Sequence, residues 1–233
     1  IQPDLTGAQA LPYQIGLNGA PEIDALNFFA SGDTSDPNSI YSKLRDHFEA
    51  MDFNSSNLID RDVATAMRTA LTTNETFNAA FASNQPFVTA FPTSFLGQQL
   101  QAVANTIAIR DALLVNRQVF FVAIGGFDTH SNQATDLPGL QTEIDAGVVA
   151  FYQAMQEIGL GSDVTLFTAS DFGRTLAING DVTDHGWGNH HFVVGDAVQG
   201  TRIYGDIPPP VLGHDQDAGS GRLIPTTSVD LFA

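Results

Sequence analysis

The sequence predicts an α/β fold in which a mostly parallel sheet is flanked by helices. Two short apolar runs, residues 118–124 and 164–168, are rich in β-branched and aromatic residues, as buried parallel strands are. Between them, apolar residues recur at helical spacing over residues 140–158. Strand, helix and strand form one βαβ unit, which joins parallel strands by a right-handed crossover. We therefore expect the carboxyl ends of both strands at one edge of the sheet.

The first half of the chain is predicted to be loops followed by helices. Residues 1–37 are rich in Gly, Pro, Asn and Asp, which indicates a loop-rich entry with one weak strand at 13–17. Residues 38–117 are predicted to be helical, with Ser39 and Ser94 placed to cap helices. The apolar spacing predicts these helices at residues 40–51, 60–71, 74–81 and 96–114.

Residues 118–233 are predicted to hold the βαβ core and the loops of a site. Gly159 and Gly161 should end the helix that precedes the second strand. Beyond Thr175 the sequence indicates loops, with three further features: a short strand at 192–194, an extended stretch at 207–210 and the start of a final helix at 222–228. Residues 1–233 are accordingly expected to form a single α/β domain.

Composition excludes several classes of function. The chain has 9 basic and 26 acidic residues, so its net charge is −17, and it lacks the basic face that nucleic-acid binding requires. It contains no cysteine, which excludes disulfides, thiolate metal sites and a cysteine nucleophile. Its apolar runs are all shorter than the roughly 20 residues of a transmembrane helix, so we expect no transmembrane segment.

Asp128 and His130 are the first candidate site residues. They stand two apart, directly after the predicted first strand and the pair Gly125-Gly126. Glycines allow backbone to approach a ligand closely, and both Asp and His ligate divalent ions. The alternative is structural: Asp128 could cap a turn while His130 packs.

Asp171 and Arg174 follow the predicted second strand. Asp171 is placed to be a metal ligand, although it could instead pair with Arg174 or cap a turn. Arg174 could bind an anionic oxygen with its planar guanidinium, or it could balance the charge of the acids beside it.

Asp184 and His185 form the third candidate pair. Adjacent residues point to opposite faces of a strand, but on a glycine-rich loop both could reach one site. The neighbouring His190 and His191 are more typical of a surface loop, although His191 opens a predicted strand and could instead be buried and hydrogen-bonded. Residues 213–219, which include His214, resemble a calcium loop but lack its closing glutamate. If the βαβ geometry holds, Asp128 and Asp171 meet in one hollow with His185 folded over them.

Five short motifs carry a resemblance to a known bacterial family. In order, they occupy residues 125–130 (Gly-Gly-Phe-Asp-Thr-His), 170–175 (Ser-Asp-Phe-Gly-Arg-Thr), 179–180 (Asn-Gly), 183–186 (Thr-Asp-His-Gly) and 222–230 (Arg-Leu-Ile-Pro-Thr-Thr-Ser-Val-Asp). From residue 119 onward the chain resembles domain of unknown function 1501. That family is placed in the alkaline-phosphatase and sulfatase superfamily and is commonly exported by the twin-arginine route.

The resemblance implies an alkaline-phosphatase-like fold and a metal centre. It implies that Asp128, His130 and His185 hold one divalent ion, with Asp171 part of a second set. Phe172 stands where the superfamily has a histidine of that second set. The strand that carries the superfamily's nucleophile has no counterpart here, and the chain begins at Ile1 without Met. We therefore expect the C-terminal part of a longer protein, incomplete at its N-terminus, and we assign no nucleophile.

Together these observations predict a metal-dependent hydrolase-like domain of the phosphatase or sulfatase type. The predicted metal ligands are Asp128, His130, Asp171, Asp184 and His185, with Arg174 holding the anion. The cofactor would be a divalent ion such as zinc, manganese or calcium, and the substrate a small anionic ester or a modified polysaccharide. The resemblance implies a periplasmic or extracellular location. The alternative is a catalytically silent, exported surface or assembly protein that keeps the fold.

Overall fold

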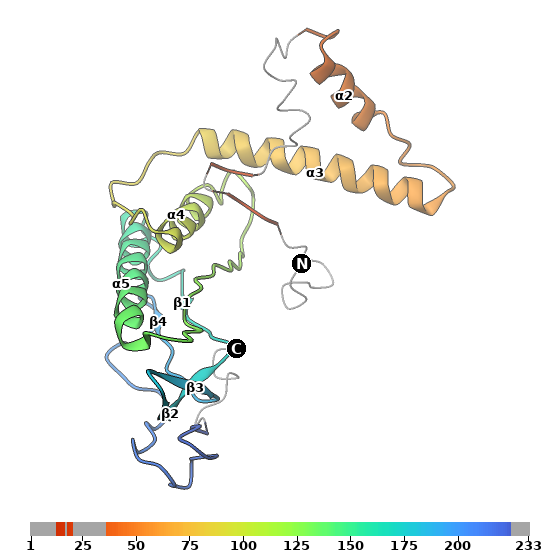
Figure 1. Ribbon diagram of the computed structural model, residues 1–233. Helices are drawn as coiled ribbons and strands as arrows, with labels where there is room; N and C mark the ends of the chain where they lie inside the picture. Colours follow the sequence, from red (N-terminus) through yellow and green to blue (C-terminus); the bar gives the residue numbers. More distant parts are fainter. Residues whose placement is uncertain (1–12, 17, 21–35, 225–233) are drawn as a thin grey trace. The chain divides into compact units, whose positions relative to one another are not determined.

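The computed structural model describes residues 13–16, 18–20 and 36–224 (Figure 1). The chain divides into two compact units. Unit 1 comprises Ile1–Pro86 and Gln101–Phe120, and unit 2 comprises Phe87–Leu100 and Phe121–Ala233. The division falls within helix α4 (Phe95–Ala108), which ends earlier than the predicted helix at 96–114. Most of the predicted loop-rich entry and most of the predicted final helix at 222–228 lie outside the described residues.

Unit 1 contains helices α2 (Ile40–Glu49) and α3 (Leu58–Ala82). The cap predicted at Ser39 is confirmed, since its hydroxyl oxygen accepts a hydrogen bond from the Ser42 N–H at 3.1 Å. The prediction of two helices at 60–71 and 74–81 is wrong. Helix α3 runs through both without a break, because it contains no glycine or proline that would interrupt its hydrogen bonds.

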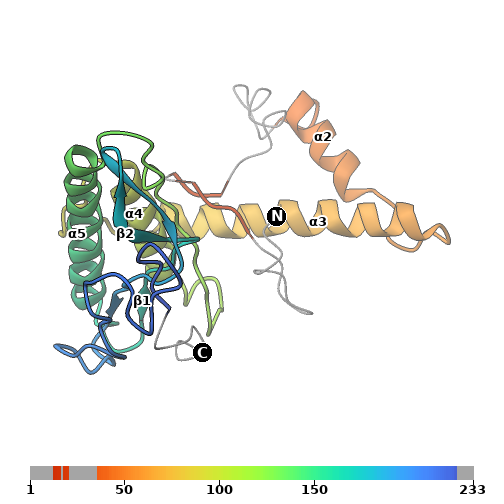
Figure 2. The same ribbon diagram turned by 60° about the horizontal axis from the view of Figure 1, so that its bottom comes forward.

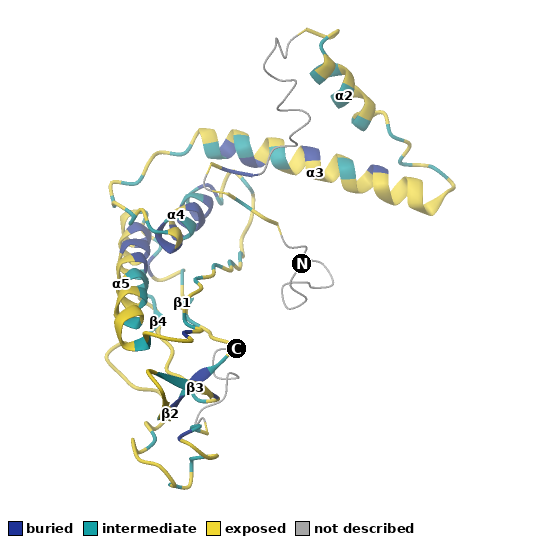
Figure 3. Ribbon diagram, viewed as in Figure 1, coloured by how far each residue is buried: buried dark blue, intermediate teal, exposed yellow. Residues whose placement is uncertain are grey.

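One apolar cluster of unit 1 consists of Ala20, Phe77, Ala80 and Ile109, with Ile15, Phe81 and Leu113 packed against it. Further apolar residues of this unit are also buried, among them Leu71 of α3 and Val103 and Ile107 of α4. Helix α2 has no buried residue, and much of α3 is exposed as well (Figure 3). Polar contacts join these two helices: Arg45 pairs with Glu75 at 3.2 Å, and Arg68 donates to the Glu49 carbonyl oxygen at 3.0 Å.

Unit 2 is built on helix α5 (Gln133–Glu157), which starts earlier than the predicted helix at 140–158 and continues through Pro138. The Asn132 N–H, at its first turn, donates to the Asp181 carboxylate at 2.7 Å, and this distant contact was not readable from helical periodicity. The predicted end at Gly159 is confirmed. Gly159 has a φ of 72°, and the Leu160 N–H donates to the Met155 carbonyl oxygen at 2.8 Å, which is a Schellman motif.

The first part of α4 packs against α5 (Figure 2). Gly147 permits this close approach, because a Cβ at this position would lie 3.1 Å from Leu100 Cδ1. Leu96 and Leu100 are buried, as are Phe151 and Met155 of α5. The Leu96 N–H at the start of α4 donates to the Glu143 carboxylate at 3.1 Å, so a side chain of α5 also caps α4.

The predicted mostly parallel sheet, and with it the alkaline-phosphatase-like fold, is wrong. The described residues contain two separate two-stranded antiparallel sheets. In one, β1 (Leu166–Phe167) pairs with β4 (Val193–Val194). In the other, β2 (Gly173–Asn179) pairs with β3 (Val182–Gly186).

The parallel sheet does not form because, among the described residues, the predicted strands lack parallel neighbours. Apolar composition indicates a strand, but a parallel ladder also requires a neighbour that runs in the same direction. Residues 164–168 meet a neighbour that runs the opposite way, since the Thr168 N–H donates to the Phe192 carbonyl oxygen at 3.0 Å. Residues 118–124 form no strand, and the Gln99 side-chain amide binds both backbone polar groups of Ala123, at 3.1 and 2.8 Å.

The β2–β3 hairpin replaces part of the loop predicted beyond Thr175. Gly180, the first of its two turn residues, has a φ of 68°, which a type II′ turn requires of that position. At the other end of the hairpin, a Cβ at Gly173 would overlap the Gly188 carbonyl oxygen. The backbone after β3 therefore lies directly against the start of β2.

Within the described part of the chain, no helix combines the length and the apolar character that crossing a bilayer demands.

Substitution of Gly173 by alanine is expected to destabilise the protein by about 1–3 kcal/mol, because the new methyl group must displace backbone rather than a flexible side chain. The matched control is Gly139→Ala on α5, where no atom lies within 4 Å of the added Cβ. That change should stabilise the helix by about 0.5–1 kcal/mol. Urea unfolding of both variants measures the effects, and a Gly173→Ala protein as stable as wild type would contradict this close approach.

The Glu157→Gln variant is expected to lose stability at neutral pH but not in acid. Hydrogen bonds from the Val88 N–H, the Thr89 hydroxyl and the Thr89 N–H lower the pKa of Glu157. A carboxyl whose pKa is lowered by folding stabilises the protein above its unfolded pKa, and the stabilisation is lost as the pH falls through the folded pKa. Unfolding free energies of wild type and variant should therefore differ at pH 7 and converge as the pH falls below the folded pKa of Glu157. A constant difference across this range would exclude the linkage.

Candidate functional site

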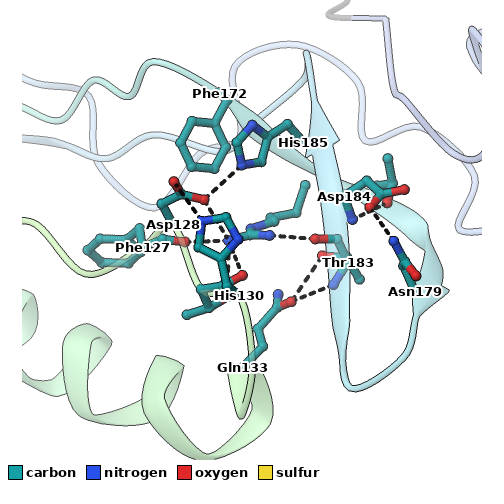
Figure 4. A network of polar contacts seen from close by, with 12 residues as sticks. Phe127, Asp128, His130, Gln133, Phe172, Asn179, Thr183, Asp184 and His185 are labelled. Carbon is teal, nitrogen blue, oxygen red and sulfur yellow. Dashed lines mark hydrogen bonds and ion pairs between the residues drawn. The ribbon is translucent and has the colours of Figure 1, made fainter.

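The candidate site is built around the carboxylate of Asp128, which lies between two imidazole rings (Figure 4). His185 Nε2 lies 2.8 Å from Asp128 Oδ1 and donates to it, since an ionised carboxylate can only accept. His130 Nε2 lies 3.3 Å from Asp128 Oδ2. The site is open to solvent: the side chains of Asp128, His130 and His185 are 52%, 84% and 53% exposed.

His185 reaches this position from β3, the second strand of the hairpin. Its ring is held on one face by Phe172, with ring centroids 4.1 Å apart and an angle of 20° between the planes. Phe172 immediately precedes β2, so both strands of the hairpin contribute to the orientation of the imidazole. The hydrogen bond from His185 is the main cause that lowers the pKa of Asp128.

Arg174 supplies a positive charge behind the carboxylate. Its side chain is half-buried, and its Nη2 atom lies 3.9 Å from Asp128 Oδ1. The same nitrogen donates to the Phe127 carbonyl oxygen at 2.7 Å, so the guanidinium contacts the loop that carries Asp128 as well as the carboxylate itself.

Two contacts at the start of α5 fix the hairpin beside this loop. The Gln133 side-chain oxygen accepts from the Thr183 N–H at 2.7 Å and lies 3.2 Å from the Thr183 hydroxyl. Asp181, in the hairpin turn, accepts from the Asn132 N–H. Sequence analysis missed both residues. The Gly180-Asp181 pair was a usable signal for the hairpin turn, because glycine at the first of two turn residues is typical of such a turn, whereas nothing in the sequence pointed to Gln133.

The other predicted site residues are placed differently. Asp184 precedes His185 on β3 and so faces the other side of the strand, where its Oδ1 accepts from the Asn179 side chain at 2.9 Å (Figure 4). For Asp171, which is exposed, the described residues provide no hydrogen-bond or ion-pair partner. The structure thus brings together Asp128, His130, His185 and Arg174, but it records no contact of Asp171 or Asp184 with them.

The remaining histidines considered from sequence lie in other environments. His191 Nδ1 lies 3.3 Å from the Thr168 hydroxyl, and partial burial lowers the pKa of His191. In the run that resembled a calcium loop, Asp217 accepts from the backbone N–H groups of Gly213, Gly219 and Gly221 at 2.7–2.8 Å. The Asp217 carboxylate therefore stabilises the conformation of this loop through hydrogen bonds to the loop's own backbone.

The possible metal ligands of the site are two imidazole nitrogens and one carboxylate, and both kinds of group bind zinc in proteins. Ligand atoms on a tetrahedral zinc ion lie about 3.3–3.6 Å apart when the bonds measure about 2.0–2.2 Å. The His130–Asp128 separation of 3.3 Å matches this spacing, and the His185–Asp128 hydrogen bond at 2.8 Å is shorter. Across residues 13–16, 18–20 and 36–224, no set of three or more His, Asp and Glu side chains already has the arrangement of a metal site.

Comparison with known proteins identifies the family. No curated protein and no solved structure matches the chain. A family model described as "Protein of unknown function (DUF1501)" matches residues 31–218, which include every residue of the site described above. This match confirms the family predicted from the five motifs, and the chain belongs to the DUF1501 family.

Proposed function

We propose that this protein is a metal-dependent hydrolase of the phosphatase or sulfatase type, with Asp128, His130 and His185 as ligands of one divalent ion. The observation that carries the proposal is the convergence of these three side chains, from the 125–131 loop and from β3, on a solvent-exposed face. Two imidazoles and one carboxylate are a usual ligand set of a catalytic zinc ion, which keeps a further position open for water or substrate.

The side chains support this role by their freedom to move. His130 is 84% exposed, so its ring can turn from the carboxylate toward an ion without disturbing the core. His185 must give up its hydrogen bond to Asp128, while Phe172 keeps the ring in the same plane. A bound divalent ion would polarise an ester oxygen and lower the pKa of an attacking water.

A positive charge near the site supports an anionic substrate. Arg174 places a guanidinium 3.9 Å from Asp128, and its charge would favour a nearby phosphate or sulfate group while its N–H donors stay bonded to backbone oxygens. We propose a small anionic ester or a modified polysaccharide as substrate, met in the periplasm or outside the cell, because of the resemblance to exported proteins. Asp171 and Asp184 are not needed for this one-ion proposal.

A second candidate is a catalytically silent, exported surface or assembly protein. One observation favours it. Phe172 stacks on His185 at the position where, by the resemblance, the superfamily places a histidine of its second ion set. Metal binding and ester hydrolysis separate the two candidates.

The metal site predicts that the protein binds about one zinc ion per chain and that His185→Ala weakens the binding. Loss of a ligand should cost more than the roughly 100-fold that removal of a ligand's outer partner costs. The matched control is His190→Ala, a neighbouring exposed histidine outside the cluster. Calorimetric titration with Zn²⁺ measures all three proteins. Equal affinity in wild type and His185→Ala would exclude this centre.

Hydrolysis of aryl phosphate and aryl sulfate tests the role of Asp128. If the Asp128→Ala variant hydrolyses these esters as fast as wild type, Asp128 takes no part in the mechanism.

A further inference from the structure

Arg174 connects the two segments that carry the site. Its Nη2 atom donates to three oxygens of the loop that holds Asp128: the Phe127 carbonyl at 2.7 Å, the Thr129 carbonyl at 3.2 Å and the Thr129 hydroxyl at 3.0 Å. Its Nη1 atom donates to the Thr183 carbonyl oxygen, on the strand that holds His185. One side chain therefore bonds to both segments at once.

No backbone ladder performs this task in the described residues. The strands β2 and β3 form a two-stranded sheet with each other, and β2 also donates backbone hydrogen bonds to the carbonyl oxygens of Ser220 and Gly221. Within the described residues no backbone–backbone hydrogen bond joins either strand to residues 125–131, so that loop is joined to them through side chains. A planar guanidinium suits such a link, because its nitrogens point in fixed directions and can reach acceptors on two segments together. The Arg174 side chain is only 21% exposed, so its donors lie mainly among these backbone oxygens rather than in solvent.

Arg174 also supports His185 indirectly. Its Cζ atom lies 5.4 Å from the centre of the Phe172 ring, which in turn stacks on the His185 imidazole. The guanidinium thus contacts the backbone on either side of Asp128, the strand beneath His185 and the ring that orients His185.

We propose that Arg174 is a positioning residue that sets the separation of Asp128 from His185, so that both can hold one divalent cation; this rests on the proposed function. Two other roles make different predictions. If Arg174 mainly balanced the charge of Asp128, removing its charge would strengthen cation binding, because the guanidinium, 3.9 Å from the Asp128 carboxylate, repels a cation bound to that carboxylate. If it mainly bound the anionic substrate, its removal would leave cation binding unchanged.

The test measures the affinity of the full chain for Zn²⁺ alone in two variants. Arg174→Lys keeps the charge but cannot bond both segments, and Arg174→Met removes charge and donors with a similar chain length. Positioning predicts that both variants bind Zn²⁺ about 10- to 100-fold more weakly than wild type. The matched control is Arg222→Met, since Arg222 is a half-buried arginine of the same unit that donates to the Gly219 carbonyl at 3.2 Å and lies outside the cluster. Its affinity should equal that of wild type.

Gln133→Ala provides a second variant in case loss of Arg174 prevents folding. It removes the acceptor of the Thr183 N–H on the same strand, so it should weaken Zn²⁺ binding in the same direction. Unaltered affinity in Arg174→Lys, or stronger affinity in Arg174→Met, would overturn the positioning role.

A metal-free readout separates this inference from the proposed function. Crystal structures of metal-free wild type and Arg174→Lys compare the separation of Asp128 Oδ1 and His185 Nε2, which is 2.8 Å with the arginine in place. A lost contact in the variant supports positioning even if wild type binds no Zn²⁺, in which case only the proposed function fails. A retained contact overturns the inference whatever the metal results are.

Discussion

Helix α5 is the element on which the rest of unit 2 depends. Gly147 lets α4 approach it closely, and Glu143 and Glu157 accept backbone hydrogen bonds from the segment that contains the start of α4. At its first turn, Gln133 holds the strand that carries His185. These acceptors lie on one rigid helix, so they hold the non-helical segments that bond to them at defined positions. The geometry of the candidate site therefore depends on α5.

The features that sequence predicted well are those decided by neighbours along the chain. Ser39 caps α2 and Gly159 ends α5, because capping depends on a hydroxyl or a left-handed residue at one position. Helix boundaries that depend on distant partners were missed. The start of α5 at Gln133 is fixed by the hairpin, which lies about 50 residues further along the chain.

The prediction of a parallel sheet was wrong because an apolar run indicates that a strand is favourable but does not indicate which neighbouring strand it pairs with. Residues 164–168 pair with an antiparallel neighbour, and residues 118–124 pair with none in the described structure. Asp128 and His185 nevertheless lie in contact, by a route that the parallel-sheet argument did not contain. The hairpin turns at Gly180 and returns His185 to the loop, where Arg174 bonds to both sides. Whether these residues bind a metal stays a prediction.

The alternation of Asp184 and His185 along β3 has a consequence for how the chain reaches its native pairing. If β3 slipped past β2 by one residue, every side chain would exchange faces, and Asp184 would be presented to Asp128 in place of His185. Two carboxylates would then oppose each other where the His185 imidazole now donates a hydrogen bond. Repulsion between these carboxylates would disfavour the misaligned hairpin relative to the native pairing.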